Sequence, residues 1–255
     1  MTARHARLVS SLGAVLLAWA CTNSYEIQIE TPIRPKLDVG AFQRVLVAGF
    51  LAGGTEDVDG NLETTRLLRS QLRSKSELRV IDSDVLPLMD VASEGRANDS
   101  GGGQAAAPAP GAIKEQKDLD PYEHLFANVE YWKKIGEEYQ QPLIVTGTVM
   151  FTPLARNQLV QREQEVYDSF GRRRVIPIRS YQERKGFSLD GRFIFIDGRN
   201  GSTLHSETFA EQVLYSANQT TPALSSYFEL MDRLIPSFLS TLSSQKIKGT
   251  RILLQ

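Results

Sequence analysis

The chain has 255 residues, of which 41% are hydrophobic, and it carries 29 Lys or Arg against 30 Asp or Glu. This composition is sufficient for a folded core, and the nearly balanced charge argues against bulk nucleic-acid binding. Cys21 is the only cysteine, so the sequence excludes a disulfide within the chain and offers no cysteine cluster for zinc.

Residues 1–20 have the pattern of a bacterial export signal. Two arginines precede an apolar run from Leu8 to Ala20, which is shorter than the roughly 20 residues that a membrane-spanning helix needs. Cys21 follows the run directly. We therefore expect residues 1–20 to be a signal peptide that is removed before Cys21.

The stretch LLAWAC, which ends at Cys21, resembles the bacterial lipobox. In that motif the cysteine sulfur receives a diacylglycerol and the new N-terminus receives an acyl chain such as palmitate, and together these chains anchor a protein stably. Ala18 stands where the motif prefers Leu, and a secreted protein with a free thiol is the alternative. Thr22 differs from the Asp that retains such proteins at the inner membrane. The resemblance therefore implies a lipid anchor in the outer membrane, on the periplasmic side.

The mature chain begins with a stretch of little periodicity. Residues 21–42 contain Pro32 and Pro35, so we predict a lipid-anchored tether there and a single α/β domain over residues 43–255. The first expected elements of that domain are a buried strand at 44–50, an amphipathic helix at 62–74 and a short strand at 78–81. Asp82 or Ser83 can then cap a short helix that runs to about Met89.

Residues 92–118 are rich in Gly, Ala, Pro and Ser and predict a disordered surface insertion. After it, Asp120 and Pro121 predict the start of a helix that continues to Gln140. Residues 143–151 then predict another buried strand.

The second half of the chain predicts strands followed by a helix. Residues 154–185 are expected to form an extended β-hairpin arm that turns at Gly171, and DGRNG at 197–201 predicts the next hairpin turn. A strand at 202–215, an amphipathic helix at 224–242 kinked by Pro236 and a short strand at 249–255 complete the pattern. The fold class expected is α/β, with a mixed sheet, helices packed on it, and the arm.

The sequence contains no recognised catalytic constellation. His124 and His205 are the two histidines of the mature chain and lie far apart, and the nucleophile-elbow, HExxH and Walker A motifs are absent. The loop GGTEDVDGN at 53–61 lacks the Lys of a phosphate loop, and an EF-hand register would put Thr55 and Arg66 at its two charge-critical positions. An acidic turn before a helix is the simpler interpretation. We expect no metal, no cofactor and no enzymatic activity.

Basic residues cluster in the predicted arm. Between Arg156 and Lys185 there are eight Lys or Arg against four acidic residues. Because the guanidinium fork suits phosphate and carboxylate, the arm is a candidate contact surface for anionic lipid, an acidic protein or the acidic peptides of the cell wall. The alternative is a solvated strand face that discourages aggregation. The candidate contact residues are Arg172, Arg173, Arg174 and Arg179.

Four stretches resemble the curli-secretion-channel (CsgG-like) lipoprotein family and proteins with the TolB amino-terminal type of domain. They are RVLVAGF, LRSQLRSKSELRVID, PLIVTGTVMF and RFIFIDGRNGSTLHSET. The resemblance implies a mixed α/β fold. Channel members of that family cross the membrane with paired hairpins. Here both strands of the arm carry charge on both faces, and too few residues follow Tyr215 for a second hairpin.

We therefore expect a non-channel member that acts as a binding or assembly module of the cell envelope, with an envelope protein or the cell wall as partner. One alternative is a subunit of an oligomeric envelope export apparatus, which would be a homo-oligomer. The weaker alternative is a periplasmic enzyme.

Overall fold

The computed structural model describes residues 24–99, 113–167, 169–216, 219 and 221–254. The predicted signal peptide and Cys21 lie outside these residues. The chain divides into two compact units, one spanning Lys36–Leu242 and the other containing the first and last strands. Within the described residues, no helix has both the length and the apolar character needed to cross a membrane.

The larger unit is built on a five-stranded mixed sheet with the order β3-β2-β4-β5-β6. Strand β2 pairs in parallel with β3 and β4, whereas β5 is antiparallel to β4 and β6. The strands are β2 (Arg44–Gly54), β3 (Arg79–Val80), β4 (Leu143–Tyr167), β5 (Arg173–Asp197) and β6 (Thr203–Tyr215). The fold class, including the hairpin arm, is as the sequence predicted.

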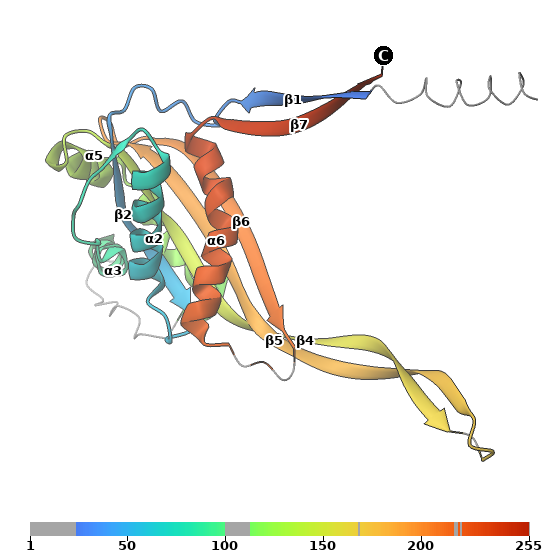
Figure 1. Ribbon diagram of the computed structural model, residues 1–255. Coiled ribbons are helices and arrows are strands. Elements are labelled where there is room, and N and C mark those ends of the chain that lie inside the picture. The colour runs from blue at the N-terminus through green and yellow to red at the C-terminus, as the bar shows by residue number, and fades with distance from the viewer. Residues whose placement is uncertain (1–23, 100–112, 168, 217–218, 220, 255) are drawn as a thin grey trace, which may run out of the picture. The chain divides into compact units, whose positions relative to one another are not determined.

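Helices cover both sides of this sheet (Figure 1). Helices α2 (Gly60–Lys75) and α6 (Ala223–Leu242) lie on one side, and Pro236 lies within α6. The other side carries the 3-10 helices η2 (Gln116–Asp118) and η3 (Asp120–Tyr122), and helices α3 (Leu88–Asp99), α4 (His124–Ala127) and α5 (Val129–Glu138).

Two hydrophobic clusters form the core, one on each side of the sheet. Alternate residues of a strand point to opposite sides. Val145 and Phe151 of β4 accordingly join the cluster under α2 and α6, and Ile144 and Met150 join the cluster with Trp132 of α5. Because both sides are covered, the first nine residues of β4 are buried without alternation. This explains the continuous apolar run that the sequence shows there.

A β-bulge fixes the position of α2 against β2. The pairing register shifts between Val47 and Gly49, and Gly49 has a φ of 147°. The backbone groups released by the bulge find side-chain partners: Arg69 donates to the Val47 carbonyl at 2.7 Å, and Asn61 accepts from the Phe50 N–H at 2.7 Å. These bonds hold α2, at its first turn and again in its third, against the middle of β2.

The turn at 197–201 is the hairpin turn that the sequence predicted. The Asp197 carboxylate accepts from Arg199 through Nε at 2.9 Å and through Nη2 at 2.8 Å, and the Gly201 N–H donates to the Asp197 carbonyl. Hydrogen bonds from Arg199 hold the pKa of Asp197 below its ordinary value of 3.8.

The helices on the second side differ from the prediction. Helix α3 starts at Leu88, after Pro87, and continues to Asp99, because Leu88 and Ala92 are buried in the core. The short helix predicted after a cap at Asp82 or Ser83 is therefore wrong. Disorder is wrong for residues 92–99 and for residues 113–118, where Ile113 is buried and Gln116–Asp118 form a 3-10 helix. Residues 100–112 lie outside the described residues.

The helix predicted from Asp120 to Gln140 is interrupted. Asn128 leaves the helical conformation, and its side chain accepts from the Tyr131 N–H at 3.0 Å, which begins α5 as a new helix. The Trp132 indole then donates to the Leu125 carbonyl at 2.9 Å. Apolar periodicity across the break had made the two helices look like one.

The second unit is a two-stranded antiparallel sheet. Strand β1 (Ser24–Ile33) pairs with β7 (Gln245–Leu254) over its whole length. The prediction of a tether over residues 21–42 included no regular secondary structure and is wrong for Ser24–Ile33, which form a strand. The sequence indicates this strand by the alternation of Ile27 and Ile29 with charged or polar neighbours.

Candidate functional site

The β4–β5 hairpin extends beyond the sheet as a two-stranded arm (Figure 1). Strand β4 loses its pairing with β2 after Phe151, and β5 pairs with β6 only from Lys185 onward. Strands β4 and β5 continue to pair with each other as far as Tyr167 and Arg173. The arm, residues 154–185, therefore lies where the sequence predicted it, with Gly171 in the turn at a φ of 74°.

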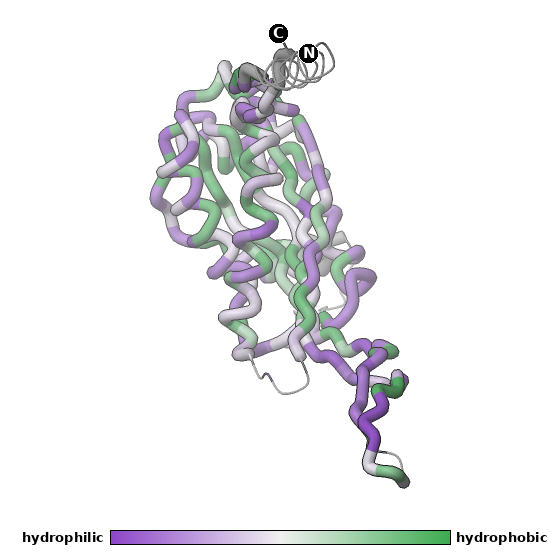
Figure 2. Tube along the Cα trace, turned by 45° about the vertical axis from the view of Figure 1, so that its right-hand side comes forward, coloured by the Kyte–Doolittle hydropathy of each residue, from purple (hydrophilic) through white to green (hydrophobic). Residues whose placement is uncertain are grey.

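The arm is almost entirely exposed and carries large apolar side chains. Phe170 and Tyr181 are each 81% exposed. Figure 2 shows the arm as mainly hydrophilic chain interrupted by hydrophobic residues. Apolar groups of this size in contact with solvent, on a segment that covers no core, are typical of a contact surface. The other exposed large apolar residues of the arm are Leu159, Val166, Tyr167, Val175, Ile176 and Ile178.

The pairing register sorts the charges of the arm onto two faces, because residues directly opposite each other share a face. One face, the Arg face, carries Arg156, Arg162, Arg174 and Arg184, and none of its paired residues between 154 and 186 is acidic. The other face, the mixed face, carries three basic and three acidic residues. These are Arg173, Arg179, Lys185, Glu163, Glu165 and Glu183.

The four arginines predicted as contact residues do not form one cluster. Arg173 and Arg179 lie on the mixed face, where Arg173 forms an ion pair with Glu165. Arg174 lies on the Arg face, and Arg172 in the turn places its guanidinium 5.3 Å from the centre of the Phe170 ring. Arg172, Arg173 and Arg174 lie at the tip of the arm, whereas Arg179 lies six residues farther along β5 from Arg173, opposite Gln161.

One pair of residues was missed by the sequence reasoning. Arg156 and Arg184 are directly opposite each other on the Arg face. Arg156 is exposed and Arg184 is partly buried, with its Nε atom enclosed and without a hydrogen-bond partner. Counting outward from Gly171 would have placed Arg156 opposite Gly186, because the observed register is centred on Phe170, one residue earlier.

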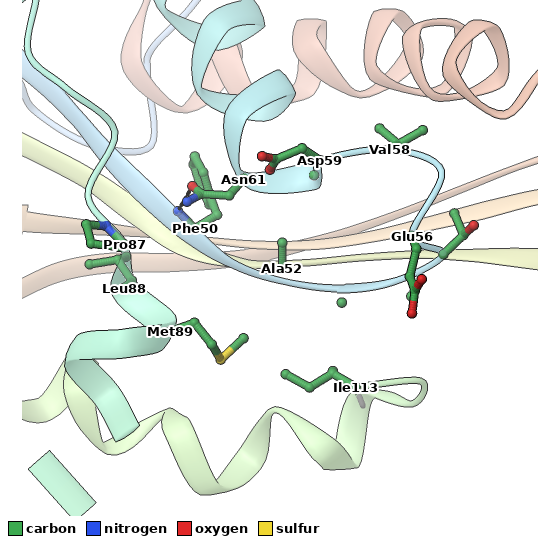
Figure 3. A pocket seen from close by; sticks show the side chains of 14 residues that line it. Phe50, Ala52, Glu56, Val58, Asp59, Asn61, Pro87, Leu88, Met89 and Ile113 are labelled. Carbon is green, nitrogen blue, oxygen red and sulfur yellow. Dashed lines mark hydrogen bonds between the residues drawn. The ribbon is translucent and has the colours of Figure 1, made fainter. Parts of the chain in front are cut away.

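A second candidate is a crevice at the carboxyl end of β2, with a volume of about 570 Å³ (Figure 3). The chain leaves β2 for α2 on one side of the sheet, and leaves β3 for α3 on the other. Ligands of open α/β sheets commonly bind at such a switch point. The walls are the end of β2, the loop 55–59, and the first residues of α2 and α3.

The chemistry of this crevice is sparse. Its titratable lining residues are Glu56 and Asp59. Asp59 is engaged in capping α2, since its Oδ1 accepts from the Leu62 N–H at 2.9 Å. Across the described residues, no group of three or more His, Cys, Asp and Glu side chains could hold a metal ion. His124 is exposed on α4, and His205 lies on β6, as the sequence indicated.

No protein-family model and no curated protein matches the sequence. Similar solved structures include lipoprotein GNA1162 from Neisseria meningitidis, with 13% identity and a TM-score of 0.35 over 77% of this chain and 97% of that chain. The PelC dodecamer from Paraburkholderia phytofirmans has 14% identity and a TM-score of 0.33 over 86% and 97%. The LpoB C-terminal domain from Salmonella enterica has 8% identity and a TM-score of 0.27 over 71% and 86%. At these scores we draw no functional conclusion from the similarities.

Proposed function

We propose that this chain is a lipoprotein of the bacterial envelope that acts as a binding or assembly module rather than as an enzyme. Cys21 carries the lipid and anchors the protein in the outer membrane, on the periplasmic side. The arm is the surface that contacts an envelope partner, either a protein or the cell wall.

The observation that carries this proposal is the construction of the arm. Both of its faces are largely open to solvent. Its exposed apolar side chains include Phe170 at the tip and Tyr181 farther along β5. Aromatic residues and arginines are enriched where proteins bind each other. The crevice supports an enzyme less well, because Asp59 is occupied as a helix cap and leaves Glu56 without a second free titratable group in the lining.

The anchor is tested by metabolic labelling with a palmitate analogue in cells that express the wild type or Cys21→Ser. The wild type should be labelled and should float with the outer membrane, and the variant should lose both properties. If neither protein is labelled and both are soluble, the anchored module is the wrong description.

The contact surface is tested by cross-linking in cells. Replacing Arg172, Arg173 and Arg174 with Ser should remove most of the partners that the wild type captures. The matched control replaces three exposed lysines outside the arm, Lys75, Lys133 and Lys134, with Ser and changes the net charge equally. If the arm variant retains every partner, the tip of the arm is not the contact surface.

One observation favours the second candidate, a subunit of an oligomeric export apparatus. Beyond Phe151 in β4, and before Lys185 in β5, the outer hydrogen-bonding edge of each strand has no strand partner among the described residues. Such edges can pair with neighbouring copies. Light scattering of the purified protein separates the candidates: a monomer excludes this one, and a ring in electron micrographs supports it.

A further inference from the structure

The Arg156–Arg184 pair is unfavourable in the isolated arm. Two like charges directly opposite each other in an antiparallel pair repel and destabilise the pairing. Neither guanidinium has a hydrogen bond or ion pair with any residue that the structure describes, and the Arg184 Nε is buried without a partner. The two guanidinium groups are therefore left without a negatively charged partner among the described residues, and an acceptor that reaches their terminal nitrogens would relieve the repulsion.

The surroundings of the pair do not supply that acceptor. The neighbouring pairs on the same face are Leu154–Gly186 and Gln158–Gln182, and neither brings a negative charge. The first acidic residue along this face is Asp190, which is six residues from Arg184, or about 20 Å along a strand. Asp190 already accepts from the Ser188 hydroxyl at 2.9 Å. An anion from outside the chain is therefore the group that fits.

Two opposed guanidinium forks select the kind of anion. Each fork presents parallel N–H donors, which match the oxygens of a phosphate group in a bidentate manner. The arm as a whole carries eight basic and four acidic residues, although the chain has a net charge of −1. This imbalance directs the arm, rather than the rest of the protein, toward a negatively charged surface.

We propose that Arg156 and Arg184 together bind the phosphate group of an anionic membrane lipid. The inference rests on the proposed function and deepens it, because it names what one face of the arm contacts. The partly exposed aliphatic residues of the same face, Val160 and Ile178, then lie against the apolar part of the membrane interface. The mixed face is left for a protein partner.

The test is the binding of the mature chain, residues 21–255 with Cys21→Ser, to vesicles that contain phosphatidylglycerol. Arg156→Gln combined with Arg184→Gln should weaken binding about 25-fold, since each arginine near an anionic surface contributes about fivefold. The matched control, Arg173→Gln combined with Arg179→Gln, removes the same charge from the mixed face and should weaken binding at most a few-fold. Equal losses in the two variants would overturn the proposal.

A third variant separates hydrogen-bond geometry from charge. Arg156→Lys combined with Arg184→Lys keeps the net charge but removes the forks, and binding should fall several-fold, by less than in the Gln variant. If this variant bound the vesicles as strongly as the wild type does, bidentate binding of the phosphate by the two arginines would be refuted. In the variant with Arg156→Gln and Arg184→Gln, removal of the repulsion should leave the midpoint of thermal unfolding unchanged or raise it, so a loss of binding there is not a loss of fold.

Inorganic phosphate and polyglutamate serve as the soluble probes. Binding of either probe that depends on Arg156 and Arg184, with no binding to the vesicles, would show that a membrane lipid is not the ligand. The assay contains no partner protein. Failure of the lipid proposal and failure of the cross-linking experiment are therefore distinguishable.

Discussion

Strands β4 and β5 are each 25 residues long and pair without interruption, yet their two halves have opposite environments. In the half inside the sheet, side chains such as Phe193 and Phe195 are completely buried. In the arm, the same antiparallel ladder continues with its side chains in solvent. The ladder alone therefore does not determine burial, and the two halves should respond to substitution in different ways.

The difference lies in what surrounds the ladder. Phe193 is packed against the rings of Phe50 and Phe238, with ring centres 5.6 and 5.1 Å away. The arm has only cross-strand neighbours, for example Leu159 opposite Tyr181. A cross-strand pair contributes roughly 0.2–1 kcal/mol, whereas a buried aromatic ring contributes several times more. Stability should therefore reside in the sheet and binding in the arm.

The largest expected effect is that of Phe193→Ala. Removing a fully buried ring leaves a cavity, and the free energy of unfolding should fall by about 3–5 kcal/mol. Tyr181→Ala in the arm, where the side chain is 81% exposed, should change it by less than about 0.5 kcal/mol. Urea unfolding of both variants measures the contrast, and similar losses would show that the arm is part of the folded core.

A pair of glycines sharpens the comparison. Gly147 in β4 has a φ of 147°, and a Cβ there would clash with the carbonyl of Arg192 on β5. Gly147→Ala should therefore cost about 3 kcal/mol. Gly171 at the turn of the arm has a φ of 74° but open space around it, so Gly171→Ala should cost about 1 kcal/mol from backbone strain alone. Thermal unfolding should rank the two variants in that order.

An ion pair in each half gives a smaller contrast that depends on pH. The pKa of Asp197 is lowered by its bonds to Arg199, so this pair stabilises the fold above pH 3.8 and the stabilisation is lost as the pH falls below that value. Asp197→Asn should remove about 1 kcal/mol at pH 7, because Arg199 is half exposed. It should also flatten the acid side of the stability profile.

The matched variant for this ion pair is Glu165→Gln, which breaks the pair with Arg173 in the arm. Both partners are exposed, so the change at pH 7 should be smaller than for Asp197→Asn. A larger effect of Glu165→Gln would contradict the division between a stabilising sheet and a binding arm.

Deletion of the whole arm should also have only a small effect on stability for a change of its size. Ala155 and Lys185 are opposite each other, so an Asn-Gly turn can connect them and replace residues 156–184. The free energy of unfolding should change by no more than about 1 kcal/mol, because the deleted residues bury little apolar surface. Cross-linking to envelope partners should disappear. If the deletion variant retained its partners, the contact surface would lie outside the arm.

Local patterns in the sequence were sufficient to predict most strands of the five-stranded sheet and the hairpin arm. The continuous apolar run at 143–151 indicates a strand covered on both sides, and Gly171 between polar segments indicates a hairpin. Helix breaks were harder to predict, because the apolar side chains of Leu125 and Trp132 keep a helical spacing across the interruption at Asn128. There the capping bond of Asn128 outweighs the periodicity.

The candidate site could be predicted only in part. The arginines at the tip are adjacent in sequence and stand out, whereas Arg156 and Arg184 are 28 residues apart and meet only through the register of the hairpin. The crevice depends on which side of the sheet each helix crosses, which no local pattern encodes. Strand β1 was missed for a related reason, since its partner lies at the opposite end of the sequence.

The pairing of β1 with β7 also sets an order of events during folding. Ile33 pairs with Gln245, so the two strands meet across a connecting segment of roughly 210 residues. As the chain is synthesised from its N-terminus, β1 has to wait for nearly all of the remaining residues before its partner exists. During that interval the β1 segment, which contains Ile27 and Ile29 and begins three residues after Cys21, has no partner strand and is free to associate with another chain. The step most sensitive to premature association is therefore the closing of this two-stranded sheet, whose last strand follows all the strands of the five-stranded sheet in the sequence.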